Sequence, residues 1–435
     1  MPEQTASWDV AIIGGGGAGL AIAAASLEAG RRVVLFERGT PAEATPVDIL
    51  LAAARRGHQG RAWPVAGAPM ADPLAPFAAR GVTVVRASAH FIAPRRIEAA
   101  GRAYPFRHAV IAAGRAPVVP ALYGLAGVPW LTASGLLALE EAPEHLLVLG
   151  GGAQAVEIAQ AQALLGHRVS LVQTGPNILP GEDLELVVPL RDALRASGVA
   201  LHENADVLSV ETAGAGIALL LEGGARLEGS HLLLAVGEAP RLSPLDLAAG
   251  RIEATPRGVA VGPGLRSTSN RRVWAVGSIA DTGWPVAAPG QHAAVVADAM
   301  LRGLRSRLGD TAPPRLVRSR PALAQAGMTE AEAKAAGREP QVVRVPLEGV
   351  DVAKLVADPQ GRLLGASLLA AEAGEISALL AVAIGQGMSG RDLAALPLPR
   401  STTAAAIARA AGNLRGAEFP SSPKRRIFGA LDRWL

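Results

Sequence analysis

The clearest pattern along the chain is a short apolar run, a cluster of glycines, an apolar helical stretch and a second apolar run. Residues 8–13, 18–29 and 32–36 follow this order. An apolar run bounded by glycine predicts a buried strand, and the longer stretch between the runs predicts a helix. The pattern therefore predicts a parallel βαβ unit whose glycines join the first strand to the helix.

The same pattern occurs a second time, at residues 145–149, 153–165 and 168–172. Each unit predicts a doubly wound, mostly parallel sheet covered by helices, because parallel strands are buried on both faces. A chain of 435 residues is long enough for two such domains and a further one.

Three further apolar runs each end in a glycine and frame the two units. They span residues 109–113, 232–236 and 272–276, and a helix is predicted after the last of them over residues 291–301. The order runs from the first unit to the second and back to the first. It predicts that the second parallel-sheet domain is inserted into the first.

After about Pro313 the pattern changes to short strands that alternate with helices, which is typical of an α+β domain. Strands are expected at residues 341–345, 353–357 and 363–369, and helices at residues 330–336, 374–385 and 402–411. The predicted fold class is α/β, with two Rossmann-like domains and a C-terminal α+β domain. The predicted domains are residues 1–125 with 255–312, residues 126–254, residues 313–415, and a tail over residues 416–435.

Composition and charge exclude several function classes. Aromatic residues make up 3% of the chain, and the arginines behind its net charge of +4 are scattered, which disfavours nucleic-acid binding. The longest apolar stretch, residues 363–388, is interrupted by Glu372 and Glu375, so no transmembrane helix is expected. No signal-peptide pattern is present, and a cytoplasmic location is expected.

The chain contains no cysteine. This absence excludes catalysis by a thiolate of this chain and excludes thiolate metal ligands. The 8 histidines are dispersed and show no spacing typical of a metal site. We therefore predict no metal.

The first glycine cluster has the properties of a dinucleotide site. Gly14 allows the tight turn, Gly16 lets backbone N–H groups approach a pyrophosphate, and Gly19 lets the helix pack on the strand. The amino terminus of the helix favours the phosphate charge. Glu37 ends the second strand, where a carboxylate can accept hydrogen bonds from ribose hydroxyls.

The second glycine cluster repeats the design with two changes. Gly150 and Gly152 keep their positions, Ala155 stands at the third glycine, and Gln173 replaces the terminal acid. An amide can still bond a ribose hydroxyl and does not repel a 2′-phosphate, yet no arginine follows to bind one. The choice between NADH and NADPH stays open.

Taken together, the chain resembles the pyridine nucleotide–disulfide oxidoreductase family, which includes dihydrolipoamide dehydrogenase and mercuric reductase. The matching residues are 14–19 with Glu37, 112–117 with Pro120, 150–157, 235–237, 273–277, 364–366 and 373–376. The resemblance implies FAD in the first domain, NADH or NADPH in the second, and a homodimer through the third.

The resemblance also implies which residues hold each cofactor. FAD would be held by Gly14, Gly16, Gly19, Glu37, Arg38, Ala113, Gly114, Gly277 and Ser278. The nicotinamide cofactor would be held by Gly150, Gly152, Ala155, Glu157, Gln173 and Gly237.

The largest departure from the family concerns its redox loop. Family members carry two cysteines there, followed by a helix with a lysine that faces the flavin. Here most of the loop is missing, although the helix is retained from Pro46, and the lysine position is taken by Asp48. The family's partner acid corresponds to Glu157. Two facing carboxylates raise one pKa, which would provide a proton donor near the flavin. The alternative is that Asp48 points to solvent.

Further departures lie elsewhere. The acid that binds the ribityl chain in the family is replaced by Ser278, and losing a charged hydrogen bond costs about 1.5–3 kcal/mol. The arginine expected after Gly237 is replaced by Glu238. Residues 398–403 lack the histidine that protonates a thiolate in the family, which is consistent with a chain without thiols.

Two more features have open alternatives. His292 lies where the family has a small residue, so it could stabilise negative charge on the flavin or carry protons, or it could simply be exposed at the start of a helix. Residues 424–435 form a basic amphipathic pattern, which suits either peripheral contact with the inner face of a membrane or packing on the protein's own dimer.

The leading functional prediction is an FAD-dependent NAD(P)H oxidoreductase without a redox disulfide. Hydride would pass from nicotinamide to flavin and then to a small-molecule or protein electron acceptor. The alternative is a catalytically degenerate nucleotide-binding sensor or scaffold. A disulfide or mercuric reductase would require thiols supplied by a partner.

Overall fold

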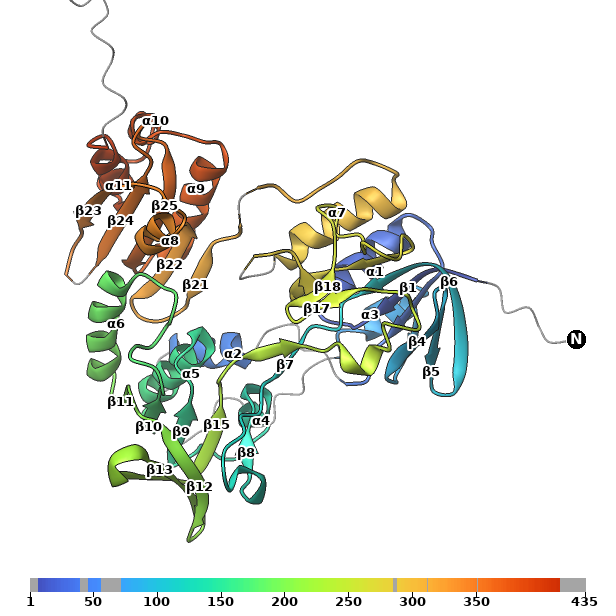
Figure 1. The fold of residues 1–435 in the computed structure, drawn as a ribbon, viewed down its shortest axis with the longest axis horizontal. Helices are drawn as coiled ribbons and strands as arrows, with labels where there is room; N and C mark the ends of the chain where they lie inside the picture. The colour runs from blue at the N-terminus through green and yellow to red at the C-terminus, as the bar shows by residue number, and fades with distance from the viewer. Residues whose placement is uncertain are drawn as a thin grey trace, which may run out of the picture. The chain divides into compact units, whose positions relative to one another are not determined.

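The computed structural model describes residues 7–39, 46–55, 72–284, 288–310, 312–349 and 351–414 (Figure 1). By its contacts the chain divides into two compact units. The first unit is Met1–Pro176 with His202–Gly309, and the second is Asn177–Leu201 with Asp310–Leu435. Among the helices of the described residues, none is both long and apolar enough to cross a membrane.

The first sheet of the first unit has the strand order β3-β2-β1-β6-β5-β4, with β19 beside β6. Its strands are β1 (Trp8–Ile13), β2 (Val33–Phe36), β3 (Thr83–Val85), β4 (Ala89–Ala93), β5 (Arg96–Ala99), β6 (Arg102–Ile111) and β19 (Val273–Ala275). Strands β1, β2, β3 and β19 and the second half of β6 run parallel. The strand that returns after the second domain, β19, thus joins the same sheet as β1.

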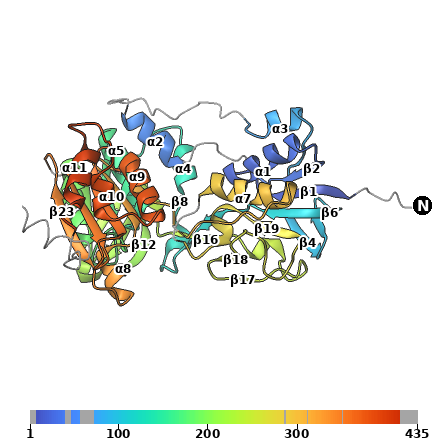
Figure 2. The same cartoon turned by 90° about the horizontal axis from the view of Figure 1, so that it is seen from above.

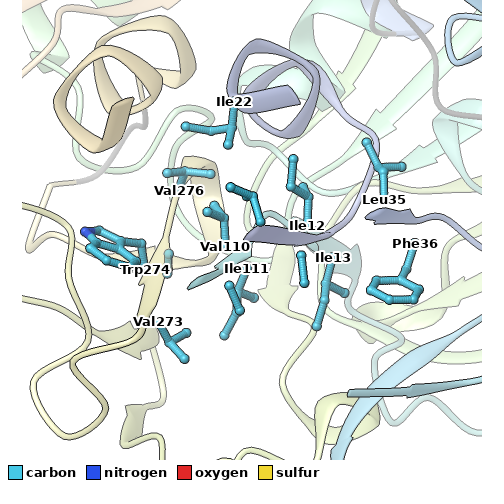
Figure 3. Close-up of a cluster of buried hydrophobic side chains, with 14 of the residues drawn as sticks. Ile12, Ile13, Ile22, Leu35, Phe36, Val110, Ile111, Val273, Trp274 and Val276 are labelled. Carbon is cyan, nitrogen blue, oxygen red and sulfur yellow. The ribbon is translucent and has the colours of Figure 1, made fainter. Parts of the chain in front are cut away.

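Helices cover one face of this sheet. Helices α1 (Gly17–Glu28) and α7 (Pro289–Leu301) lie side by side there, and a small sheet of β17 (Ala254–Thr255), β18 (Gly258–Ala260) and β20 (Ala280–Asp281) lies on the other face (Figure 2). The core between them is built from Ile12, Val110 and Val276 and their neighbours (Figure 3). The apolar runs of the sequence are therefore buried strands, as their lack of polar positions predicts.

The second sheet of the first unit has the order β11-β10-β9-β15-β8. Its strands are β8 (Trp130–Leu131), β9 (His145–Leu149), β10 (Arg168–Val172), β11 (Val199–His202) and β15 (His231–Leu234). Helix α5 (Ala153–Leu164) packs on β9 and β10. Helix α2 (Pro46–Arg55) contacts both α5 and α4 (Ala133–Leu137). A meander of β12 (Val207–Ala213), β13 (Gly216–Leu221) and β14 (Arg226–Gly229) follows.

A two-stranded ribbon marks the two places where the chain passes between the two sheets. Strand β7 (Arg115–Pro117) follows the first sheet and pairs antiparallel with β16 (Glu238–Pro240), which follows the second. The Arg115 guanidinium donates to the carbonyl oxygen of Glu238, with Nη2 at 2.8 Å. Short helix α3 (Ala75–Ala79) lies before β3.

The second unit contains a five-stranded sheet of order β21-β22-β25-β24-β23. Its elements are β21 (Arg315–Val317), β22 (Ala322–Gly327), β23 (Gln341–Pro346), β24 (Val352–Ala357), β25 (Leu363–Ala370), α8 (Glu330–Ala335), α9 (Ala373–Gly385), α10 (Gly390–Ala394) and α11 (Thr403–Ala411). All its strand pairs are antiparallel. Helix α6 (Leu184–Ala196) contacts β25 and so belongs to this unit by its contacts.

Candidate functional site

The first glycine turn connects β1 to α1. Gly14 has φ of 108°, and a Cβ there would collide with the carbonyl oxygen of Ala112, the residue directly after β6. A Cβ at Gly19 would collide with the carbonyl oxygen of Gly14. Both positions therefore require glycine, for a left-handed turn and for close packing of the helix on the strand.

The space above this turn is open. A Cβ at Gly16 or Gly17 would meet no atom within 4 Å. Gly16 is also the N-cap of α1, and no side chain caps the amino terminus of this helix. The first backbone N–H groups of the helix are thus available to an anion, which the helix dipole also favours.

Glu37 lies at the end of β2 and faces the glycine turn. Its carboxylate accepts hydrogen bonds from the backbone N–H of Gly15 at 2.7 Å and of Gly39 at 2.9 Å. Glu37 and Arg38 line a pocket with Gly14 and Ala113. This is the place where the turn predicts the adenosine part of a dinucleotide.

Sequence reasoning missed several residues of this pocket. Ser88 and Ala89 come from the start of β4, and Arg241 and Leu245 come from the segment after β16. Arg241 donates from Nε to the carbonyl oxygen of Arg115 at 2.8 Å, so it is held in place by the inter-sheet ribbon. No local motif marks these residues, because the fold brings them together from distant segments.

Gly114 and Gly277 are two further glycines predicted for the first site, and a Cβ at Gly277 would lie 3.4 Å from the side chain of Ala18 in α1. Both are left-handed, with φ of 68° and 72°, which glycine adopts without strain. Ala112 donates its N–H to the carbonyl oxygen of Ile13 at 2.7 Å, so the chain before Ala113 and Gly114 is tied to the first glycine turn. Ser278 is exposed, and its carbonyl oxygen accepts from Arg115 Nη1 at 3.3 Å.

His292 is fully buried in α7, so the alternative of an exposed side chain is wrong. The helix begins earlier than predicted, at Pro289, which places His292 on its buried face. Its Nδ1 accepts a hydrogen bond from the backbone N–H of Gly277 at 3.1 Å. Burial lowers the pKa of His292 from its ordinary value. The imidazole is therefore neutral near pH 7, and its accepting Nδ1 leaves the proton on Nε2.

The second glycine turn reproduces the first. Gly150 has φ of 124°, and a Cβ there would collide with the carbonyl oxygen of Ala235, while a Cβ at Gly152 would meet nothing within 4 Å. Gly152 caps α5 without a side-chain hydrogen bond. Ala155 is fully buried at the third position, where its methyl group fits.

Gln173 takes the place that Glu37 has in the first site. Its side chain lies so close to Gly151 that a Cβ there would be 2.7 Å from the Gln173 carboxamide carbon. Gly237 has φ of 117°, and its carbonyl oxygen accepts from the Val118 N–H at 3.0 Å. Gln173 thus borders the second glycine turn, and Gly237 borders the ribbon of β7 and β16.

Asp48 and Glu157 lie on two helices in contact. Asp48 is half-buried on α2, and Glu157 is 4% exposed on α5, against which α2 packs. Helix α2 thus packs on α5 of the second nucleotide fold, and its identity with the family's helix after the redox loop stays a prediction. The predicted pairing of the two carboxylates stays a prediction.

The residues present fit a dinucleotide at each turn: the glycines leave open space over an uncapped helix terminus, and Glu37 or Gln173 borders it. Among the described residues, no group of three or more metal-ligating side chains comes together. The basic tail and residues 40–45 of the shortened loop lie outside the described residues, so the predictions on them stand as predictions.

Comparisons with known proteins agree with this geometry. Residues 8–330 match the family model described as pyridine nucleotide-disulphide oxidoreductase, and residues 313–411 match the dimerisation domain of that family. The chain is 32% identical over 460 aligned positions to a mercuric reductase of Streptomyces lividans, covering 94% of this chain and 97% of that protein. A dihydrolipoyl dehydrogenase of Thermus scotoductus is 30% identical, with 76% and 75% covered.

The fold is also that of a solved flavoprotein. An HOCl-induced flavoprotein disulfide reductase from Escherichia coli superimposes with a TM-score of 0.82 at 24% identity, covering 94% of this chain and 100% of that one. The α/β architecture with two Rossmann-like sheets and a C-terminal dimerisation domain is thereby confirmed. With two glycine turns of the same geometry and both family models matched, the chain belongs to the pyridine nucleotide-disulphide oxidoreductase family.

Proposed function

We propose that this protein is an FAD-dependent oxidoreductase that uses NADH or NADPH and reduces an acceptor other than a disulfide. The observation that carries the proposal is the paired glycine turns, each with open space over an uncapped helix terminus. Without a cofactor the fold itself would not require glycine at Gly16 and Gly152, because a Cβ at either position would meet no atom within 4 Å.

The nature of the acceptor follows from the absence of cysteine. Bound FAD supplies a centre that accepts a hydride from reduced nicotinamide. In a chain without thiols, no disulfide of its own can take the electrons onward. We infer a direct acceptor, which is a quinone, dioxygen, a second nicotinamide or a protein.

The chain's own residues have distinct roles in this proposal. Gly14, Gly16 and Glu37 bind one dinucleotide, and Gly150, Gly152 and Gln173 bind the other. His292 acts as a positioning residue, because its Nδ1 holds the Gly277 N–H and with it the left-handed turn before Ser278.

Two carboxylates provide the proposed proton source. Glu157 is almost fully buried on α5, and burial disfavours the charged form of a carboxylic acid. If Asp48 adds a second negative charge, one of the two groups stays protonated near pH 7 and can donate to a reduced acceptor. This assignment rests on the packing of α2 against α5.

Assembly and location are part of the same proposal. The match to the family's dimerisation domain over residues 313–411 supports a homodimer. We propose a cytoplasmic protein, with contact to the inner face of the membrane through residues 416–435 as the further prediction from their basic amphipathic pattern.

The first test is the visible spectrum of the purified protein. We expect FAD absorption that bleaches when NADH or NADPH is added without oxygen and that recovers when a direct acceptor is added, with a quinone and then dioxygen as the first two tried. The matched variant is Gly152→Trp, which fills the open space of the second turn and should keep the FAD absorption but lose the bleaching.

Other outcomes separate the alternatives. A colourless protein that takes up no added FAD would sink the oxidoreductase and favour a nucleotide-binding scaffold. Recovery of the FAD absorption with mercuric ion or a disulfide only after a thiol-bearing partner is added would instead favour a reductase that borrows its thiols.

A further inference from the structure

The first unit has a second hollow, away from both glycine turns. It measures about 460 Å³ and opens between the carboxyl end of α7, the chain at residues 303–307, and the loop before β19. A volume of this size is within the range of pockets for small molecules, roughly 300–1,000 Å³. Its walls include His108, Trp274 and Met300.

The charge of this hollow is entirely positive. Arg266, Arg305 and Arg307 line it, and none of the described residues lines it with a carboxylate. Within the described residues, none of the three forms an ion pair. Burial lowers the pKa of Arg266, and the neighbouring charges of Arg271 and Arg272 lower it further, as expected of cations held together without a counter-ion.

The floor of the hollow is apolar and carries an unsatisfied donor. The Arg266 guanidinium lies 5.0 Å from the centre of the Trp274 ring, and Met300 and Leu304 add aliphatic surface. Trp274 is 3% exposed, and its Nε1–H has no hydrogen-bond partner within the described residues. Figure 3 shows this ring nitrogen on the side of Trp274 that faces away from Val110 and Ile111. A buried indole N–H normally has a partner.

His108 adds a second unsatisfied atom. Its Nδ1 is buried and has no partner within the described residues, and its ring lies 5.3 Å from that of Trp274. Burial is the largest cause of the lowered pKa of His108, and the positive charges of four arginines lower this pKa further: Arg272, Arg266, Arg31 and Arg107. The imidazole is therefore neutral near pH 7, and one of its two nitrogens can donate.

We propose that this hollow is a binding site for a small anion with an apolar body, of the size of an aromatic phosphate monoester. The arginines and the indole N–H hold the anionic head, and Trp274, Met300 and Leu304 cover the apolar body. Planar guanidinium groups favour phosphate, because they donate two parallel hydrogen bonds to it.

The site is separate from the dinucleotide sites. His108 pairs with Val10 in β1, and Val10 lies four residues before Gly14. At about 3.3 Å per residue, His108 and Gly14 are therefore about 13 Å apart along the strand. None of the residues that line the hollow belongs to either glycine turn. The proposal therefore stands whether or not the chain turns over NADH or NADPH.

The test is isothermal titration of the full chain, saturated with FAD and without added FAD, using phenyl phosphate as the probe. We expect one site per chain that weakens as salt is raised. Phenol has the same apolar body without the charge and should not bind. Inorganic phosphate has the charge without the apolar body and should bind at least tenfold more weakly.

Variants assign the binding to this hollow. Arg266→Gln and the double change Arg305→Gln with Arg307→Gln should each weaken phenyl phosphate at least tenfold. Arg338→Gln is the matched control, because Arg338 is exposed in the second unit and outside the hollow. The double change lies at exposed positions and keeps the test valid if Arg266→Gln fails to fold.

Three results would overturn the proposal. The first is no heat from phenyl phosphate at millimolar concentration with the wild-type chain. The second is equal binding of phenyl phosphate by the wild type and by the double arginine variant. The third is equal affinity for inorganic phosphate and phenyl phosphate, which would remove the apolar part of the site.

Discussion

At the scale of single residues, His292 shows how a buried side chain can fix a glycine turn. The imidazole is buried, and its Nδ1 accepts the N–H of Gly277, which is one of the residues predicted for the first dinucleotide site. A buried N–H without an acceptor costs about 1–3 kcal/mol, so this hydrogen bond helps to fix the turn. The role can be separated from acid–base chemistry by substitution.

We expect His292→Leu to lower the free energy of unfolding by about 1–3 kcal/mol at pH 7.5, because Gly277 loses its acceptor. His292→Asn should lose less, since its amide oxygen can accept from the same N–H. Chemical denaturation of both variants, with the FAD content measured alongside, provides the comparison. Equal losses for the two variants would contradict a role in holding Gly277.

The pH dependence gives a second check on His292. Its pKa is lowered in the folded chain by burial, so the unfolded chain takes up the proton first as the pH falls. The stability that comes from keeping the ring neutral is present above about pH 6.5 and is lost below it, by up to about 1.4 kcal/mol per pH unit. Denaturation at pH 7.5 and 5.5 should therefore show a smaller drop for His292→Asn than for the wild type.

At the scale of secondary-structure elements, the two glycine turns separate folding from binding. Gly14 cannot carry a Cβ without a collision, whereas Gly16 can, because the space beside it is open. The same division holds for Gly150 and Gly152. One glycine of each turn is thus required by the chain itself, and under the proposed function the other is required by the bound cofactor.

We expect Gly14→Ala to destabilise the apoprotein by about 1–3 kcal/mol or more, because of its φ of 108° and the collision with the Ala112 carbonyl. Gly16→Ala should leave the apoprotein within about 0.5 kcal/mol of wild type. It should still weaken FAD binding, because the methyl group enters the space of the pyrophosphate. Thermal melting without FAD measures the stability of each apoprotein, and titration with FAD measures its affinity for the cofactor. A Gly16→Ala protein with unchanged FAD affinity would argue against a pyrophosphate at Gly16.

The strands beside the glycines could be predicted from sequence, while others could not. Strands β1, β9 and β10 have the predicted bounds, and a glycine directly after the apolar run marks the end of β1 and of β9. Strand β6 begins at Arg102, seven residues before its predicted start. Its first half pairs antiparallel with β5 and has one face exposed, so it lacks the continuous apolar signal of its second half, which pairs with β1.

The candidate site was predicted to a similar extent. The glycines and Glu37 follow from spacing, because their function depends on the local turn. Ser88, Arg241 and the buried position of His292 could not be predicted, since they depend on which distant segments the fold brings together. The arginine-lined hollow was missed for the same reason, as its arginines are scattered along the chain.

At the scale of the whole molecule, the second unit contains a cluster of carboxylates around the buried Lys354. Lys354 on β24 is 3% exposed, and its Nζ lies 2.9 Å from Asp183, 2.8 Å from Glu185 and 2.8 Å from Glu330. Burial alone would lower the pKa of Lys354, but the hydrogen bonds to these carboxylates outweigh it and raise the pKa. Figure 1 shows α6, which follows Asp183, beside the strands of this unit.

We expect Lys354→Met to lower the free energy of unfolding by about 3 kcal/mol at pH 7.5, because the buried Asp183 then lacks its cation and Glu185 and Glu330 each lose one of theirs. Hydrogen bonds from Arg344 and Lys354 lower the pKa of Glu185 from 4.5 to about 2 in the wild type. The stability that this lowered pKa contributes to the folded chain is present above pH 4.5 and is lost as the pH falls from 4.5 to 2.

The difference between Lys354→Met and the wild type should therefore shrink as the pH falls from 4.5 towards 2. Denaturation curves at several pH values measure this difference. Lys334→Met is the matched control, because Lys334 is 62% exposed and pairs only at the surface with Glu330. It should change stability by less than about 0.5 kcal/mol. A constant difference across the pH range would show that the charge cluster is not its cause.

The same cluster has a consequence for how the protein is made. Lys354 and Glu185 are 169 residues apart, so α6 leaves the ribosome long before the strands that it contacts. At about 5–20 residues per second, the wait is on the order of ten seconds to half a minute. During that time α6, whose Leu186, Val187, Leu190 and Leu194 are buried in the folded chain, lacks its contact with β25. We expect chaperones to bind the nascent chain over this interval, until β25 is synthesised.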